Sequence, residues 1–132
     1  MFDAMLIGVG TDGHIGSLYP DRDEVMRVDT GDWVLPVAKE EGPHSVTLSL
    51  HVMNAARTCL VACVGASDKY PAGKAEAMAR ALEADEEKKT FPAKGLSDDA
   101  TWLLDAAAAA NLSPATLGKD PRASLRALLR TF

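Results

Sequence analysis

The sequence predicts an α/β fold, a layered and mostly parallel sheet flanked by helices. Short apolar runs typical of buried strands, at 2–9, 58–64 and 101–104, alternate with segments of helical character such as 71–84. The first run is almost continuously apolar, as expected for a strand covered on both faces of a parallel sheet. With 132 residues, 47% of them hydrophobic, the chain can form one domain with a substantial core.

Glycine and proline positions define the elements expected in the first half. Pro20 ends a short helix that begins after a Gly-rich turn, and Gly42-Pro43 marks a turn between two strands. In the second of these strands Val and Leu alternate with Thr and Ser, as in a half-buried strand. The expected elements are a strand at 2–9, a helix at 14–18, a charged connection at 21–32, a strand at 33–37, a polar turn at 39–44 and a strand at 46–50.

The second half is expected to alternate helices with strands. Ala75, Met78, Ala79 and Leu82 recur at helical spacing and predict an amphipathic helix. The expected elements are a helical turn at 51–57, a strand at 58–64, a helix at 71–84, a solvated charge run at 83–89, a strand at 101–104, an Ala-rich helix at 105–111 and a terminal helix at 121–129.

Composition disfavours several classes of partner. A net charge of −5 and a pI near 5.1 argue against nucleic-acid binding. No apolar run reaches the roughly 18 residues needed to cross a membrane. Cys59 and Cys63 lie in one predicted strand, too far apart to form a disulfide, so both are expected to be reduced. We therefore expect a cytoplasmic location, with an organelle as the alternative.

The Gly-rich turn after the first strand is the most informative segment. Its glycines match the dinucleotide pattern G-x-G-x-x-G, and Asp29 lies about where a ribose-binding acid is sought. Pro20, however, leaves no room for the crossover helix of a dinucleotide fold, and Asp12 would repel a pyrophosphate. The same turn carries His14, which is suited to take a proton from water near pH 7 or, alternatively, to cap the loop. Asp12 is suited to orient His14 or to form an Asx-turn.

Four segments in order resemble the 6-phosphogluconolactonases. GVGTDGHIGSLYP is similar to that family's G-x-G-x-DGH-x-x-S-L-[FY]-P motif, and SVTLSLHVMNAARTCLVACVG to its VTLTLPVINAAR segment. GKAEAMARALE follows, and ATWLLDAAAA resembles WFLDEAAA, so the resemblance covers about residues 2–110. The DGH loop alone is shared with the glucosamine-6-phosphate deaminases of the same wider family.

The resemblance implies an activity and its catalytic residues. It implies hydrolysis of 6-phospho-D-glucono-1,5-lactone to 6-phosphogluconate, in the oxidative pentose phosphate pathway, without cofactor or metal. In this resemblance His14 is the general base and Asp12 belongs to the same site. The implied partner is a small sugar-phosphate lactone, with no nucleic acid or membrane.

The resemblance also implies substrate-binding residues. Lys74 is the expected phosphate ligand, at a helix start where a cation and backbone N–H groups favour anions, although the loop before it is longer than the family's TGxGKA form. Gly13 and Ser17 are further candidates for substrate contact. Ser17 is not expected to be a nucleophile because no G-x-S-x-G elbow is present. Arg57 is expected either to reach the substrate or to cover a helix end.

Two departures from the family pattern keep alternatives open. The Arg that usually precedes the VTLT strand is replaced by His44-Ser45, and such lactonases usually have a further N-terminal half. We therefore expect residues 1–132 to be the C-terminal half of a single α/β lactonase domain, with the missing half as its partner. A deaminase is one alternative, although its DGHIAFNEP motif carries a Glu and the segment with Leu18 carries no carboxylate. A non-catalytic sugar-phosphate-binding fragment is the other.

Overall fold

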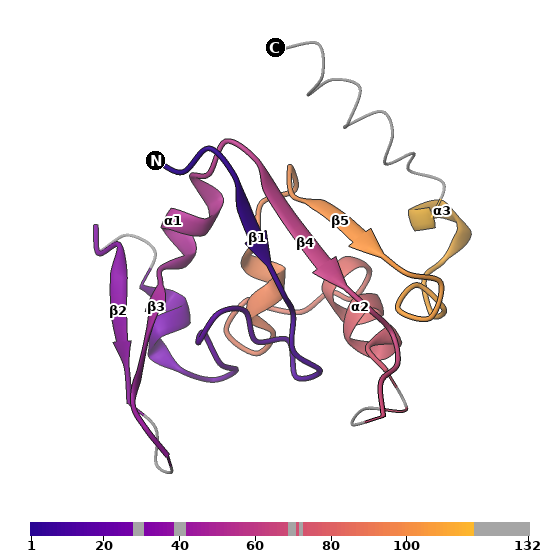
Figure 1. Ribbon diagram of the computed structural model, residues 1–132, viewed down its shortest axis with the longest axis horizontal. Helices are drawn as coiled ribbons and strands as arrows, with labels where there is room; N and C mark the ends of the chain where they lie inside the picture. Colours follow the sequence, from indigo (N-terminus) through magenta and orange to yellow (C-terminus); the bar gives the residue numbers. More distant parts are fainter. Residues whose placement is uncertain (28–30, 39–41, 69–70, 72, 118–132) are drawn as a thin grey trace.

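A three-stranded parallel sheet organises the chain. The computed structural model describes residues 1–27, 31–38, 42–68, 71 and 73–117. The parallel sheet has the order β1-β4-β5, formed by β1 (Met5–Ile7), β4 (Cys59–Cys63) and β5 (Thr101–Leu104). β2 (Val34–Val37) and β3 (Ser45–Leu48) form a separate antiparallel pair beside it (Figure 1). The α/β class and the parallel pairing predicted from the sequence are confirmed.

Short helices connect the strands. They are the 3-10 helices η1 (Asp23–Met26) and η2 (Pro92–Gly95) and the α-helices α1 (Leu50–Asn54), α2 (Ala75–Leu82) and α3 (Pro114–Leu117). Ser49 begins α1 as its N-cap and accepts a hydrogen bond from the Val52 amide. α2 lies within the predicted helix 71–84, and its buried residues are Ala77, Met78 and Ala81, so Met78 is the one residue of the predicted stripe that is buried.

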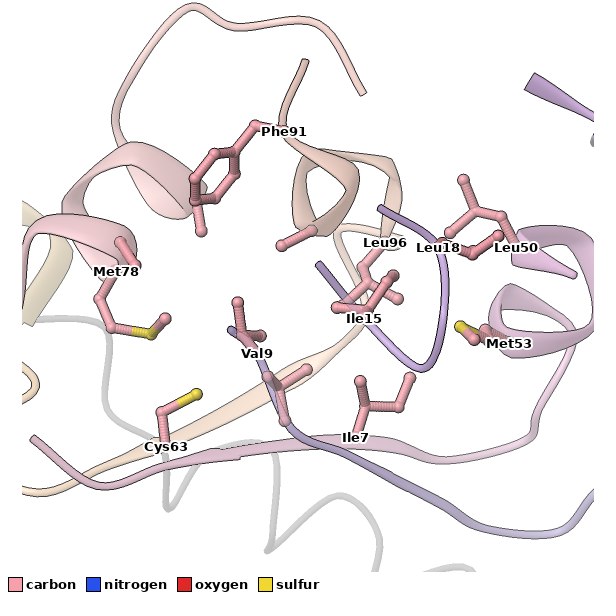
Figure 2. Close-up of a cluster of buried hydrophobic side chains, with 14 of the residues drawn as sticks. Ile7, Val9, Ile15, Leu18, Leu50, Met53, Cys63, Met78, Phe91 and Leu96 are labelled. Carbon is pink, nitrogen blue, oxygen red and sulfur yellow. The ribbon is translucent and has the colours of Figure 1, made fainter. Parts of the chain in front are cut away.

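One hydrophobic core joins the inner face of the sheet to the elements above it. Ile7 and Cys63 project from the strands toward α2 and η2, where Met78 and Phe91 are fully buried (Figure 2). Val61 of β4 is buried in the same core. The Gly-rich loop, α1 and η1 contribute to the same core. Burial raises the pKa of the Cys63 thiol, so it behaves as a small apolar core group.

The predicted helix at 14–18 is wrong. Ile15 forms antiparallel bridges to both Val9 and Leu18, so this segment is a tight turn folded back on the end of β1. Gly16 closes the turn with φ +58°, and Ile15 and Leu18 exchange backbone hydrogen bonds. Both of these apolar side chains reach the core this way, whereas a single helical turn would leave its backbone groups without partners.

Two further predictions are wrong, and two others lie wholly or partly outside the described residues. In β3 the predicted alternation is reversed, because Thr47 is buried and Val46 is exposed. Residues 106–111 form successive hydrogen-bonded turns rather than the predicted Ala-rich helix. The predicted terminal helix, 121–129, and residues 39–41 of the predicted polar turn lie outside the described residues.

The outer face of the parallel sheet is uncovered by the described residues. Leu6 is 72% exposed, Val64 is 66% exposed and Leu103 is 41% exposed, each on the face opposite the core. Parallel sheets are normally covered on both faces. This apolar face is therefore available for packing against further polypeptide.

Two neighbouring substitutions in β1 test the assignment of its faces. Leu6→Lys places the charge in solvent and should lower the free energy of unfolding by less than about 1 kcal/mol. Ile7→Lys buries an unpaired charge and should cost at least about 3 kcal/mol. Urea unfolding of both variants of the 132-residue chain measures the difference. Comparable losses would mean that the outer face is covered in solution.

Candidate active site

The Gly-rich loop is a closed turn at the carboxyl end of β1. The Gly10 amide donates to the His14 carbonyl at 2.9 Å, and the Gly13 amide donates to the Gly10 carbonyl at 3.1 Å. These two bonds fix residues 10–14 as a compact loop. The carboxyl ends of parallel strands are where open α/β sheets place their sites, and the loop occupies this position beside the end of β4 (Figure 1).

Asp12 and His14 form a hydrogen-bonded pair on this loop. Asp12 Oδ1 lies 2.6 Å from His14 Nδ1 and also accepts from the His14 backbone amide at 3.2 Å. Because an ionised carboxylate only accepts hydrogen bonds, Nδ1 carries the proton and the Nε2 lone pair of a neutral ring is left available. The His14 side chain is 35% exposed, so water can reach it.

The charge of Asp12 is stabilised by its neighbour. Burial tends to raise the pKa of Asp12, but hydrogen bonds from the His14 ring and the His14 amide outweigh this effect, and the pKa lies below its ordinary value. Asp12 is therefore ionised throughout the neutral range. An ionised carboxylate at Nδ1 stabilises the imidazolium that forms when Nε2 takes up a proton.

The His14 ring is confined by its surroundings. A Cβ added at Gly10 would lie 2.2 Å from His14 Nδ1 and 2.7 Å from Asp12 Oδ1, so the ring lies directly against the Gly10 backbone. The Tyr19 ring packs against it, with ring centroids 5.0 Å apart and the planes tilted by 39°. The absence of a side chain at Gly10 thus makes room for the pair.

The buried Phe91 ring packs against the Gly-rich loop at Gly13. Gly13 has φ +86°, and a Cβ there would lie 2.5 Å from the Phe91 ring, so only glycine fits. The Ala93 amide donates to the Gly13 carbonyl at 3.0 Å. The Arg80 guanidinium lies 4.3 Å from the centroid of the Phe91 ring and is held by Glu86. The backbone between Asp12 and His14 therefore rests on the core.

Thr47 supports the other end of the loop. Its Oγ1 accepts a hydrogen bond from the Ser17 amide at 3.1 Å and donates to the Leu48 carbonyl. This pair of bonds explains why the polar side chain of Thr47 is buried in β3 while Val46 is exposed.

Lys74 reaches the same cavity as His14. A cavity of about 350 Å³ is lined by Gly8, Val9, Gly10, Thr11, His14, Gly16 and Lys74. Lys74 immediately precedes α2, and its position depends on Gly73, whose φ is +68° and whose α-carbon packs against the Gly65 carbonyl after β4. A lysine and a helix N-terminus on one cavity favour an anionic ligand.

The structure brings together some of the predicted site residues and separates others. His14 and Lys74 line one cavity, with Asp12 hydrogen-bonded to His14. Gly13 and Ser17 donate their amides within the protein and support the loop. Arg57 lies at the opposite end of the sheet, before β4, where it pairs with Asp3 at 3.0 Å.

Sequence reasoning missed Tyr19, Thr47 and Phe91. Tyr19 lies inside the recognised motif, so its place beside His14 could have been considered. Thr47 and Phe91 are 33 and 77 residues from His14 in the sequence, and no local pattern links them to it. Their roles depend on the tertiary fold.

Among the described residues, no three His, Cys, Asp or Glu side chains gather where they could hold a metal ion. No helix in this part of the chain is long and apolar enough to cross a membrane. Asp29, which a dinucleotide site would require, lies outside the described residues, and a turn rather than a crossover helix follows Gly13.

Comparison with known proteins places these features in context. Residues 1–104 match the family model "Glucosamine-6-phosphate isomerases/6-phosphogluconolactonase". The 6-phosphogluconolactonase of Bos taurus is 37% identical over 112 residues, which are 83% of this chain and 41% of that protein. The crystal structure of a devB protein has a TM-score of 0.68 at 30% identity and covers 86% of this chain and 45% of that one. The structure of the 6-phosphogluconolactonase of Trypanosoma brucei has a TM-score of 0.62 at 28% identity, and the match covers 85% of this chain and 43% of that one.

A glycine pair tests the geometry of the site. Gly10→Ala should push the His14 ring away from Asp12 and Tyr19 at little cost in stability, because a side chain can rotate and Gly10 has no positive φ. Gly8→Ala is the matched control, since a Cβ there meets nothing within 4 Å. Nuclear Overhauser contacts between the His14 and Tyr19 rings should disappear in the first variant and persist in the second. Contacts that persist in both would place the ring elsewhere.

Proposed function

Since this chain belongs to the glucosamine-6-phosphate isomerase/6-phosphogluconolactonase family, we propose that it carries the water-activating site of a 6-phosphogluconolactonase. The observation that supports this most directly is the Asp12–His14 pair at 2.6 Å, whose imidazole shares a cavity with Lys74. The chain spans about two fifths of the length of the curated relatives it matches. The activity of the whole enzyme is part of the proposal.

The proposed reaction adds water across the ester bond of 6-phospho-D-glucono-1,5-lactone. His14 Nε2 takes a proton from water as the water oxygen attacks the lactone carbonyl carbon, and Asp12 stabilises the imidazolium. The tetrahedral intermediate then collapses with cleavage of the bond to the ring oxygen, which receives the proton from Nε2. The product is 6-phosphogluconate. The reaction has no redox step and needs no cofactor.

Lys74 is the proposed ligand of the substrate's 6-phosphate. Its ammonium, at the start of α2, offers a charge-assisted hydrogen bond to an anion in the cavity beside His14. Gly13 and Ser17 are assigned to holding the loop rather than to direct substrate contact, because their amides are engaged within the protein. Arg57 is left out of the site, since it lies at the other end of the sheet. Action in the pentose phosphate pathway, and a cytoplasmic location, belong to the same proposal.

The two other functions are less well supported. A deaminase of this family would use a carboxylate after the DGH motif, but the residues between His14 and Pro20 include none, and Leu18 there is fully buried in the core. A non-catalytic sugar-phosphate-binding fragment would keep the cavity without turnover. The Asp12–His14 hydrogen bond favours the hydrolase, because a binding module has no need of an oriented base.

The role of His14 can be tested in the intact protein with His14→Asn. The asparagine amide can still donate to Asp12, but it has no atom equivalent to Nε2. We expect kcat to fall by about 10²–10⁴-fold with little change in KM. The acidic limb of the pH–rate profile should be lost as well. A near-normal kcat with an unchanged profile would require a different base.

The role of Lys74 can be tested by comparing two lactones. A charge-assisted phosphate contact is worth roughly 1.5–3 kcal/mol, so Lys74→Ala should raise KM for the phosphorylated lactone by about ten- to a hundredfold. The unphosphorylated lactone should be far less affected, because it has no phosphate for Lys74 to bind. Equal losses on both substrates would remove Lys74 from the phosphate site. Ammonia release from glucosamine 6-phosphate would instead favour the deaminase.

A further inference from the structure

Asp105, which immediately follows β5, joins two separate backbone segments. Its Oδ1 accepts a hydrogen bond from the Gly65 amide at 2.8 Å and another from the Ala108 amide at 2.7 Å. Gly65 comes after β4 and lies 40 residues earlier in the chain. One carboxylate oxygen therefore connects the carboxyl ends of two neighbouring parallel strands. Neither the proposed reaction nor the proposed phosphate contact gives this side chain a role.

The segments on either side of this hydrogen bond are in direct backbone contact. A Cβ at Gly65 would lie 2.2 Å from the Ala107 Cβ and 2.5 Å from the Ala108 nitrogen, so the Gly65 backbone packs against the turn after β5. A Cβ at Gly73 would lie 2.5 Å from the Gly65 carbonyl oxygen. The backbone at Gly65 therefore contacts both the turn after β5 and the residue that precedes Lys74.

Lys74 depends on this backbone for its position. It follows Gly73 directly, and its carbonyl accepts a hydrogen bond from the Met78 amide at 2.9 Å in the first turn of α2. Within the part of the chain that the structure describes, no carboxylate lies within ion-pairing distance of the Lys74 ammonium. Lys74 thus reaches the cavity beside His14 because the backbone before it is held in place, and not because an acid holds its side chain.

We propose that Asp105 is a positioning residue of the phosphate site, which fixes the approach of Lys74 to the cavity by fixing the backbone at Gly65. The inference rests on the proposed function, because it concerns the same site and the same phosphorylated substrate. Asp105 does not line the cavity, so it acts through the backbone. Its loss should weaken binding of the 6-phosphate and leave water activation by His14 unchanged, since the loop that carries His14 follows a different strand, β1.

Kinetics of the intact protein on the two lactones separate this role from a general structural one. Asp105→Ala leaves both amides without their acceptor. It should raise KM for the phosphorylated lactone about three- to tenfold, less than the loss of Lys74 itself, and change kcat by less than about twofold. The value of kcat/KM on the unphosphorylated lactone should stay within about twofold of that of the unsubstituted protein. An unchanged KM for the phosphorylated lactone, or equal losses on both lactones, would overturn the proposal.

Two further variants identify the hydrogen bonds as the cause. Asp105→Asn keeps an oxygen that can accept from both amides, so its KM for the phosphorylated lactone should stay within about twofold of the unsubstituted value. Asp99→Ala removes the same charge from an exposed acid just before β5 and should also leave KM unchanged. Loss of a negative charge alone favours an anionic substrate, so the rise predicted for Asp105→Ala has the opposite sign from a direct charge effect. An equal rise in either control would contradict the proposal.

Binding of inorganic phosphate tests the placement of Lys74 without turnover. Phosphate is titrated into the intact protein carrying ¹³C-labelled lysine, and the Lys74 signal, assigned by its absence in Lys74→Ala, gives the dissociation constant. Asp105→Ala should raise this constant about three- to tenfold. The same rise in a protein that opens neither lactone would support the role of Asp105 and overturn only the proposed reaction. A Lys74 signal that does not respond to phosphate, or that responds equally with and without Asp105, would overturn the inference itself.

Discussion

Two glycines determine whether the Asp12–His14 pair can exist. Gly13 packs against the Phe91 ring, and Gly10 packs against the His14 ring. The loop backbone is therefore in close contact with the core on one side and with the His14 side chain on the other. A side chain at either position would occupy space that an aromatic ring already fills. The ring of Phe91 is in turn fixed by complete burial and by Arg80. Packing against the core thus holds the loop in one conformation, as a preorganised base requires.

The parallel sheet brings Lys74, which follows β4, close to the loop with His14, which follows β1. β1 and β4 end at the same edge, and the chain after β4 makes a close backbone approach between Gly65 and Gly73. Asp105, after β5, accepts hydrogen bonds from the amides of Gly65 and Ala108 and so joins the ends of the two strands. Lys74 follows Gly73 directly and is thereby held over the cavity that His14 lines. Residues 60 positions apart become neighbours through this one edge.

Much of this arrangement could be predicted from the sequence, and the exceptions have physical causes. The strands and α2 could be predicted because apolar runs and helical periodicity are local features of the sequence. The predicted helix at 14–18 is wrong because Ile15 and Leu18 reach the core through bridges to Val9 and to each other, and the bridge to Val9 depends on the path of the chain after β1. Thr47 was assigned to the wrong face because its partner, the Ser17 amide, is distant in sequence. The family resemblance predicts Asp12, His14 and Lys74 as site residues, but it could not reveal that Arg57 pairs with Asp3 at the far end of the sheet.

The account depends on Asp12 holding the His14 ring with the Nε2 lone pair available to water. The most direct test is ¹⁵N NMR of the two His14 ring nitrogens, recorded at a pH where the imidazole is neutral. The account predicts that Nδ1 carries the proton and that Nε2 is unprotonated, and that Asp12→Asn weakens this preference. A neutral ring protonated at Nε2 in the unsubstituted protein would contradict it, because such a ring presents a donor where the reaction requires a base.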